Sequence, residues 1–321
     1  MNPPMRLTDW LLLCLLSVLW GATFFFAAIG LRDFPPITLV LARVAIAALV
    51  LVVIIHAAGY RLPGTLAGWR PFAILALLNN LIPFSLIFIG QTRISSALAS
   101  VLNATTPLFT LLIARAFVGE PLQGHKLAGI GLGIAGVAVL MGPDLLTANQ
   151  SSLSGMGCVL GGALSYGFAA LWMRRLRHIP PLLVAAAQVT CSTIMLLPLA
   201  ALIDRFWELP APRTPAVLAI FGLAVFGTAL AYIVFFRISA SAGPSNVMLV
   251  TLLIPLTATA LATLVLAEQV ASHQAFGALA IAAGLLVIDG RALARLQRRR
   301  LDWAEGRRSA APQTAKRETV F

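Results

Sequence analysis

A pattern of proline, glutamate and glycine residues occurs twice in this chain and constrains its fold more than any other feature. Five positions recur after 148 residues: Pro107, Glu120, Gly129, Gly136 and Gly142 correspond to Pro255, Glu268, Gly277, Gly284 and Gly290. Both copies lie in long apolar sequence. We therefore expect two copies of one membrane unit.

The apolar character of the chain sets the class of protein. Hydrophobic residues make up 60% of the 321 residues and charged residues 11%, which is too apolar for a soluble core with a polar shell. A segment of about 20 apolar residues can cross ~30 Å of hydrocarbon as a helix. We predict an all-α integral membrane protein with ten transmembrane helices, at residues 10–29, 37–56, 71–90, 97–118, 124–142, 153–173, 182–202, 215–236, 245–267 and 272–290.

The distribution of basic residues predicts the orientation. With the N-terminus in the cytoplasm, 18 Lys and Arg residues lie on the cytoplasmic side and 4 lie outside, leaving aside Arg43 within a span. The positive-inside rule favours this arrangement, with both termini cytoplasmic. Because each unit has five helices, the second must cross the membrane in the opposite direction. The predicted units are two inverted five-helix repeats at residues 9–142 and 153–290, followed by a basic cytoplasmic tail at 291–321.

Two prolines interrupt the predicted fourth and ninth helices at matching positions. Pro107 and Pro255 offer no N–H to the carbonyls of Asn103 and Thr251, four residues earlier. Broken helices with polar side chains at matched places indicate two kinks that face a hydrated cavity. The alternative is a pair of packing kinks whose carbonyls are satisfied by neighbouring helices.

Amide and hydroxyl side chains lie near the middle of the third and eighth helices. Asn79 and Asn80 have counterparts in Thr228 and Tyr232. An unsatisfied amide in hydrocarbon is strongly unfavourable, so at least one asparagine should face the protein interior or water. These four residues are candidates for a substrate cavity. The alternative is hydrogen bonding between helices that serves assembly.

Arg43 is the only charged side chain well inside a predicted span. It needs a partner or a path to water. It is either the counter-ion of a substrate carboxylate or phosphate, or a structural arginine that bonds carbonyls or extends toward the membrane surface. Its counterpart at a shift of 145 residues is Gln188, which keeps hydrogen bonding without charge and so favours the structural interpretation.

Aromatic side chains give a further set of candidates. Trp20, Tyr166 and Trp172 can stack on an aromatic or cationic ligand, although aromatic residues near helix ends also serve as interfacial anchors.

Several kinds of chemistry lack the residues that they need. None of the eleven Asp and Glu residues lies in mid-membrane, so we do not expect a buried carboxylate proton relay. We find no phosphate-binding loop, zinc-binding His pair or Asp-rich magnesium pair, and expect neither enzyme activity nor a metal or cofactor. The net charge of +12 comes from the flanks of the spans and the tail, which points to lipid headgroups and not to nucleic acid. Glycine-rich spacings indicate close helix packing within a monomer, with a homodimer left open.

Three features resemble the EamA family of the drug/metabolite transporter superfamily. They are the Trp20-Gly21 pair, the spacing from Pro36 to Arg43, and the run from Pro107 to Gly119-Glu120 that continues to Gly129 and Gly136. The resemblance covers about residues 9 to 290, as two tandem units. The second copy departs from the family pattern, because Ala267 precedes Glu268 and Ser165-Tyr166 stands in place of Trp-Gly.

This resemblance implies ten helices in an inverted arrangement around a central cavity. The cavity positions that it implies are Asn79, Asn80, Ser100, Asn103, Trp172 or Tyr166, Met248 and Thr251. We interpret the chain as a secondary transporter of a bacterial inner membrane that exports amino acids, related metabolites or drugs by alternating access. The alternatives are an exchanger of organic or phosphorylated anions that uses Arg43, and, from another class, an integral membrane enzyme or a scaffold.

Overall fold

The computed structural model describes residues 5–147, 149–247 and 249–289, and within these ranges the regular structure is helical throughout, without a β-strand. Two π-helical segments, η1 and η4, lie inside longer helices, and two short 3-10 turns, η2 and η3, follow others. In chain order the elements are α1 (Leu7–Gly30), α2 (Pro36–Ala57), α3 (Leu66–Ala76), η1 (Leu77–Leu81), α4 (Ile82–Gln91), α5 (Ser96–Asn103), α6 (Thr106–Val118), α7 (Gly124–Leu146), α8 (Gln150–Met173), η2 (Arg174–Leu176), α9 (Pro181–Ile203), η3 (Phe206–Glu208), α10 (Thr214–Phe221), η4 (Gly222–Leu230), α11 (Ala231–Ala242), α12 (Pro244–Val247), α13 (Val250–Leu264) and α14 (Ser272–Asp289).

Eight of these helical stretches in the described residues are long and apolar enough to cross a membrane. They are Leu7–Gly30, Pro36–Ala57, Leu66–Gln91, Ser96–Val118, Gly124–Gly142, Gln150–Leu176, Pro181–Ile203 and Thr214–Ala242. Two shorter apolar helices, Val250–Leu264 and Ser272–Ile288, lie where we expected the ninth and tenth spans. The all-helical membrane class is confirmed. The ninth helix is shorter than expected, since α13 begins at Val250 and ends at Leu264.

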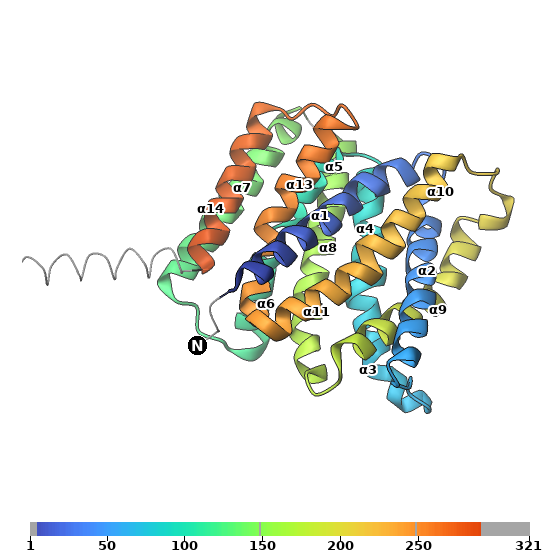
Figure 1. Cartoon of the computed structure of the whole chain (residues 1–321). Helices are drawn as coiled ribbons and strands as arrows, with labels where there is room; N and C mark the ends of the chain where they lie inside the picture. The colour runs from blue at the N-terminus through green and yellow to red at the C-terminus, as the bar shows by residue number, and fades with distance from the viewer. Residues whose placement is uncertain (1–4, 148, 248, 290–321) are drawn as a thin grey trace, which may run out of the picture.

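Helices of the two halves of the chain pack against each other in matched pairs. α7 lies alongside α14, and α2 packs against α9 (Figure 1). α1 packs against α13, and the corresponding helices α6 and α8 are also neighbours. Each pairing therefore joins one helix of the first half to one of the second.

The contact between α7 and α14 depends on glycine. A Cβ atom on Gly129 would lie 2.6 Å from the carbonyl oxygen of Gly284, and one on Gly136 would lie 2.8 Å from that of Gly277. In the sequence repeat Gly129 corresponds to Gly277 and Gly136 to Gly284. Gly129 thus contacts the counterpart of Gly136, and Gly136 contacts the counterpart of Gly129. This crossed pattern is that of an interface between two equivalent surfaces related by a two-fold axis.

The two proline-containing helices differ from each other. In the first half, helix geometry breaks at Ala104, directly before α6, in which Pro107 is the second residue. The hydroxyl of Thr106 donates to the carbonyl oxygen of Asn103 at 2.8 Å, so the carbonyl that Pro107 leaves without a backbone donor finds a local partner. In the second half α13 runs through Pro255 without interruption. The interruption that we expected at Pro255 is therefore absent from α13.

The turns that end α6 and α13 have the same backbone conformation. Gly119 has φ +72° and Ala267 has φ +55°, and each is followed by a glutamate. The N–H of Glu120 donates to the carbonyl of Ala114 at 3.3 Å, and the N–H of Glu268 donates to that of Ala262 at 3.0 Å. In both turns the N–H of the glutamate thus reaches back six residues, around a residue in the left-handed conformation that is common at helix C-termini. The alanine at position 267 therefore does not change how the turn presents its glutamate.

Gly284→Ala tests the close contact of α7 with α14. The new methyl group would collide with backbone atoms, which cannot move independently, so we expect the free energy of unfolding to fall by about 1–3 kcal/mol. The loss should appear as a lower melting temperature of the purified protein in detergent. Gly131→Ala is the matched control, because no atom lies within 4 Å of its Cβ position. Equal melting temperatures for the two variants would contradict this packing.

Candidate functional site

The π-helical segment η1 places two asparagines in the middle of the third span. Pro83 has no N–H, and the N–H of Ile82 donates to the carbonyl of Leu77, five residues back. The carbonyl of Leu78 therefore has no backbone donor, and the hydroxyl of Ser165 from α8 donates to it at 2.7 Å. The proline thus widens the helix at Asn79 and Asn80. Such widened turns occur frequently at functional sites.

Asn79 and Asn80 are joined to α9 and α11 by side-chain hydrogen bonds. Asn79 Nδ2 donates to Gln188 Oε1 at 3.1 Å and lies 3.4 Å from the hydroxyl oxygen of Tyr232. Asn80 Nδ2 donates to Ser192 Oγ at 2.9 Å, and the Tyr232 hydroxyl donates to Asn80 Oδ1 at 3.2 Å. Asn80 is fully buried, whereas Asn79 and Tyr232 are partly exposed. The structure therefore brings these two asparagines and Tyr232 together, as the sequence suggested.

Arg43 lies in the same layer of the bundle. Its Nε donates to Thr228 Oγ1 at 2.9 Å, and its Nη2 donates to the carbonyl of Gly227 at 3.3 Å. The guanidinium carbon lies 3.9 Å from the centre of the Phe84 ring, which is cation–π distance. Among the described residues, Arg43 forms no ion pair with a carboxylate. The buried charge is therefore held by a hydroxyl, a carbonyl and an aromatic face.

These hydrogen bonds cross between the halves of the chain. Arg43 of α2 reaches Thr228 in η4, and Gln188 of α9, the counterpart of Arg43, reaches Asn79 in η1. We use the name polar layer for Arg43, Asn79, Asn80, Gln188, Ser192, Thr228 and Tyr232. The Nε2 atom of Gln188 in this layer is buried and has no hydrogen-bond partner in the part of the chain that the structure describes.

The other predicted site residues lie in different places. Tyr166 packs edge-on against Phe84, beside the polar layer. Trp172 donates from Nε1 to the carbonyl of Pro71 at 2.9 Å and carries Arg175 over its ring at 4.5 Å, near the end of α8. Ser100 is buried in α5, where its hydroxyl donates to the carbonyl of Ala97. Met248 lies outside the described residues.

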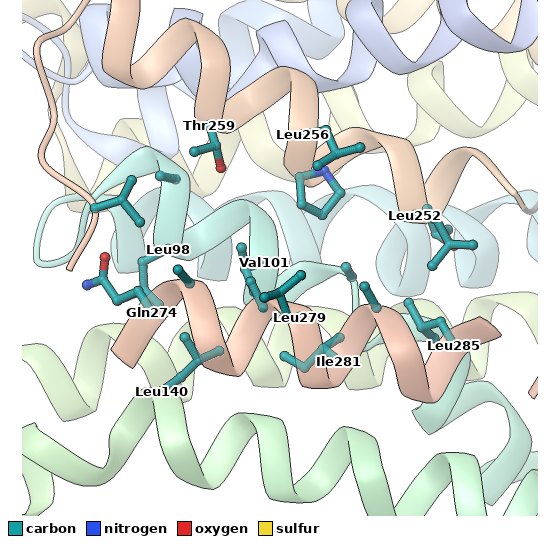
Figure 2. A pocket seen from close by; sticks show the side chains of 18 residues that line it. Leu98, Val101, Leu140, Leu252, Leu256, Thr259, Gln274, Leu279, Ile281 and Leu285 are labelled. Carbon is teal, nitrogen blue, oxygen red and sulfur yellow. The ribbon is translucent and has the colours of Figure 1, made fainter. Parts of the chain in front are cut away.

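A cavity of about 370 Å³ lies between α5, α13 and α14 (Figure 2). Its lining is apolar apart from Thr251, Thr259 and Gln274, and it includes Pro255. Leu256 and Leu279, which flank it, are each 66% exposed. Thr251 is the only predicted polar site residue in this lining, so the cavity is separate from the polar layer.

Several residues of the site were not predicted from the sequence. Ser192 lies one helical turn after Gln188, and this spacing could have indicated a shared face of α9. Pro83 lies three residues after Asn80 and could have indicated a widened helix. A row of aromatic contacts runs from Trp20 through Phe235 and Phe236 to Tyr232, with ring centroids 5.5, 5.3 and 6.1 Å apart. Phe235 and Phe236 carry no signal that separates them from ordinary core residues.

The fold and the polar layer together define a multi-pass α-helical membrane protein that keeps polar side chains and one arginine inside an apolar bundle. Comparison with known proteins assigns the family. The model of the EamA-like transporter family matches residues 8–142 and 153–289. The chain belongs to this family, and it is therefore a membrane transporter and not an enzyme.

Individual relatives agree with this assignment. The chain is 26% identical over 274 residues to the uncharacterized transporter YoaV of Bacillus subtilis, covering 84% of this chain and 93% of the relative. It is 27% identical over 291 residues to a probable amino-acid metabolite efflux pump of Escherichia coli, covering 87% and 94%. A crystal structure, 20% identical, superposes with a TM-score of 0.63 over 91% of this chain and 99% of the other, which shows that the fold is shared.

Arg43→Gln tests how the polar layer is held. The variant loses the guanidinium contact with Phe84 and one of two hydrogen bonds, so we expect the free energy of unfolding to fall by about 1–3 kcal/mol, measured as a lower melting temperature. Arg32→Gln, at an exposed arginine, is the control and should melt like the parent protein. An unchanged melting temperature with selective loss of anion transport would instead make Arg43 the binder of a substrate anion.

Proposed function

We propose that this transporter has ten membrane spans, arranged as two inverted five-helix units that rock around the polar layer by alternating access. The crossed hydrogen bonds of the polar layer carry this proposal. Arg43 of the first unit bonds Thr228 of the second, and Gln188 of the second unit bonds Asn79 of the first. The crossed glycine contacts of α7 and α14 support it at a second place. Two similar units that meet at matched, widened helices are typical of transporters with inverted repeats.

We further propose that the membrane is a bacterial inner membrane and that both termini are cytoplasmic. The end of the bundle that holds Glu120 also holds Arg174, Arg175 and Arg177, and the positive-inside rule assigns such an end to the cytoplasm. At the opposite end Arg213 forms an ion pair with Asp33, which offsets its charge. We name the two ends the Glu120 end and the Glu268 end, and we assign the Glu268 end to the outside.

The substrates that suit the polar layer are neutral or zwitterionic. Its partly exposed members, Asn79 and Tyr232, offer amide and hydroxyl groups, and the unpartnered Gln188 Nε2 offers a donor to a substrate oxygen. The aromatic row beside them provides an apolar surface. Arg43 already bonds Thr228 and Gly227, which supports a structural role over anion exchange.

The relatives suggest the direction and class of transport. One of them is named as a probable amino-acid metabolite efflux pump, and we propose export of amino acids or related metabolites for this chain as well. Asn103 and Thr251, in the interrupted fourth and ninth helices, complete the proposed path, together with Ser100 and Tyr166. No metal or cofactor enters this mechanism, in which the gradient of the solute, or of a coupled ion, drives net movement and differential affinity for the two states couples binding to the conformational change.

Flux into or out of proteoliposomes tests the proposed site. With labelled amino acids and related metabolites under an imposed gradient, the parent protein should carry at least one class faster than empty vesicles. Asn79→Ala removes one amide that bonds Gln188, so we expect flux to fall ~10-fold in a variant that still melts in a single cooperative transition. Gln123→Ala, at an exposed loop position, is the control.

Two results would contradict the proposal in different ways. Flux by the parent protein that never exceeds that of empty vesicles would contradict transport of these solutes. Parent-like flux by Asn79→Ala would show that the substrate passes elsewhere.

A further inference from the structure

The two glutamates of the sequence repeat have different partners. The carboxylate of Glu268 accepts hydrogen bonds from the backbone N–H groups of Ser96 and Ala97, both at 3.1 Å. These donors belong to the first turn of α5, where N–H groups have no partner within the helix and favour negative charge. The side chain of Ser95 accepts from the N–H of Leu98 at 3.2 Å. Glu268 thus ties the turn between α13 and α14 to the start of α5.

The α5 side of this contact is buried, and Glu268 itself is partly exposed. Ser96 is 2% exposed and Ala97 3%, and α5 packs against α13 and α8. The first half of the fourth span and the last part of the ninth are therefore joined at the Glu268 end.

Glu120 is presented by an identical turn but is engaged differently. Its carboxylate pairs with Arg174, which follows α8, and the two side chains are 44% and 35% exposed. The hydrogen bond from Arg174 lowers the pKa of Glu120 below its ordinary value. An exposed pair of this kind contributes little to stability, so it can exchange partners readily. At this end the short helix α12, which starts the ninth span, packs mainly against α11.

The apolar cavity lies directly beneath the Glu268 contact. Its lining includes Ala97 and Leu98 of α5 and Gln274 of α14 (Figure 2). Because about 370 Å³ between these helices is not filled by side chains, the packing of α5 is incomplete on this side. The hydrogen bonds of Glu268 add to the contact that α5 makes with α13.

We propose that Glu268 is the latch that keeps the outer end of the transporter closed, and that this structure is the inward-facing state. In the outward-facing state Glu268 releases α5, while the exposed pair of Glu120 and Arg174 at the other end rearranges. The inference rests on the proposed function, since it assigns the two ends to opposite sides of the membrane.

Spin-label distances in proteoliposomes test the latch without any substrate. One pair of labels at Thr92 and Gln269 reports on the Glu268 end, and a second pair at Gln123 and Ala240 reports on the Glu120 end; all four positions are exposed. Glu268→Gln keeps the shape of the side chain but removes its charge. We expect the distance between the labels at Thr92 and Gln269 to lengthen, with loss of its short-distance population. The distance between the labels at Gln123 and Ala240 should shorten.

Glu120→Gln is the matched control, because it makes the same change at the corresponding position of the first repeat. It should leave the short distance at the Glu268 end intact. The latch is overturned if Glu268→Gln, folded as judged by its melting temperature, keeps the parent distances, or if both variants change the distances in the same way. If the distances shift in Glu268→Gln but the parent protein moves no solute, the latch is supported and the proposed transport is rejected. If the parent protein moves solute but the distances do not shift in Glu268→Gln, transport is supported and the latch is rejected.

Discussion

Inside an apolar bundle in a membrane, each polar group has to find its partner within the protein, since no water is at hand to replace it. Apart from Gln188 Nε2, the polar layer satisfies this requirement by bonding across the two halves of the chain. Arg43 uses a hydroxyl, a carbonyl and an aromatic face of its neighbours, and Asn79 and Asn80 use side chains of α9 and α11. The arrangement of α2, α9 and the widened helices is therefore specified by polar contacts as well as by shape.

Backbone irregularity and polar contact are coupled in this layer. Pro83 frees the carbonyl of Leu78, and Ser165 supplies the missing donor. In η4 the carbonyls of Leu223 and Gly227 accept from Thr228 and Arg43. Side chains can exchange such bonds at a lower free-energy cost than a regular helix can break its own. A layer built in this way can accommodate two arrangements of the halves, which alternating access requires.

Much of the fold could be predicted from residues that repeat. The pairing of Pro107 with Pro255 and of Glu120 with Glu268 predicted two similar units, and apolar length predicted the spans of an all-helical membrane protein. Within the site, Asn79, Asn80 and Tyr232 were expected together and lie together. Composition cannot predict which carbonyl a proline frees once a helix widens, nor that Glu268 bonds α5, because both depend on how distant helices are placed. α13 shows the same point, since it runs through Pro255 without the interruption that we expected.

The central claim is that the two units cross the membrane in opposite directions. It is tested most directly by single cysteines at Thr92 and Ala240, which are exposed and stand 148 residues apart, in a chain whose Cys14, Cys158 and Cys191 are replaced by alanine. We expect a membrane-impermeant maleimide applied to intact cells to label the cysteine at position 92 and to reach the one at position 240 only after permeabilisation. Labelling of both positions from the same side would contradict the account.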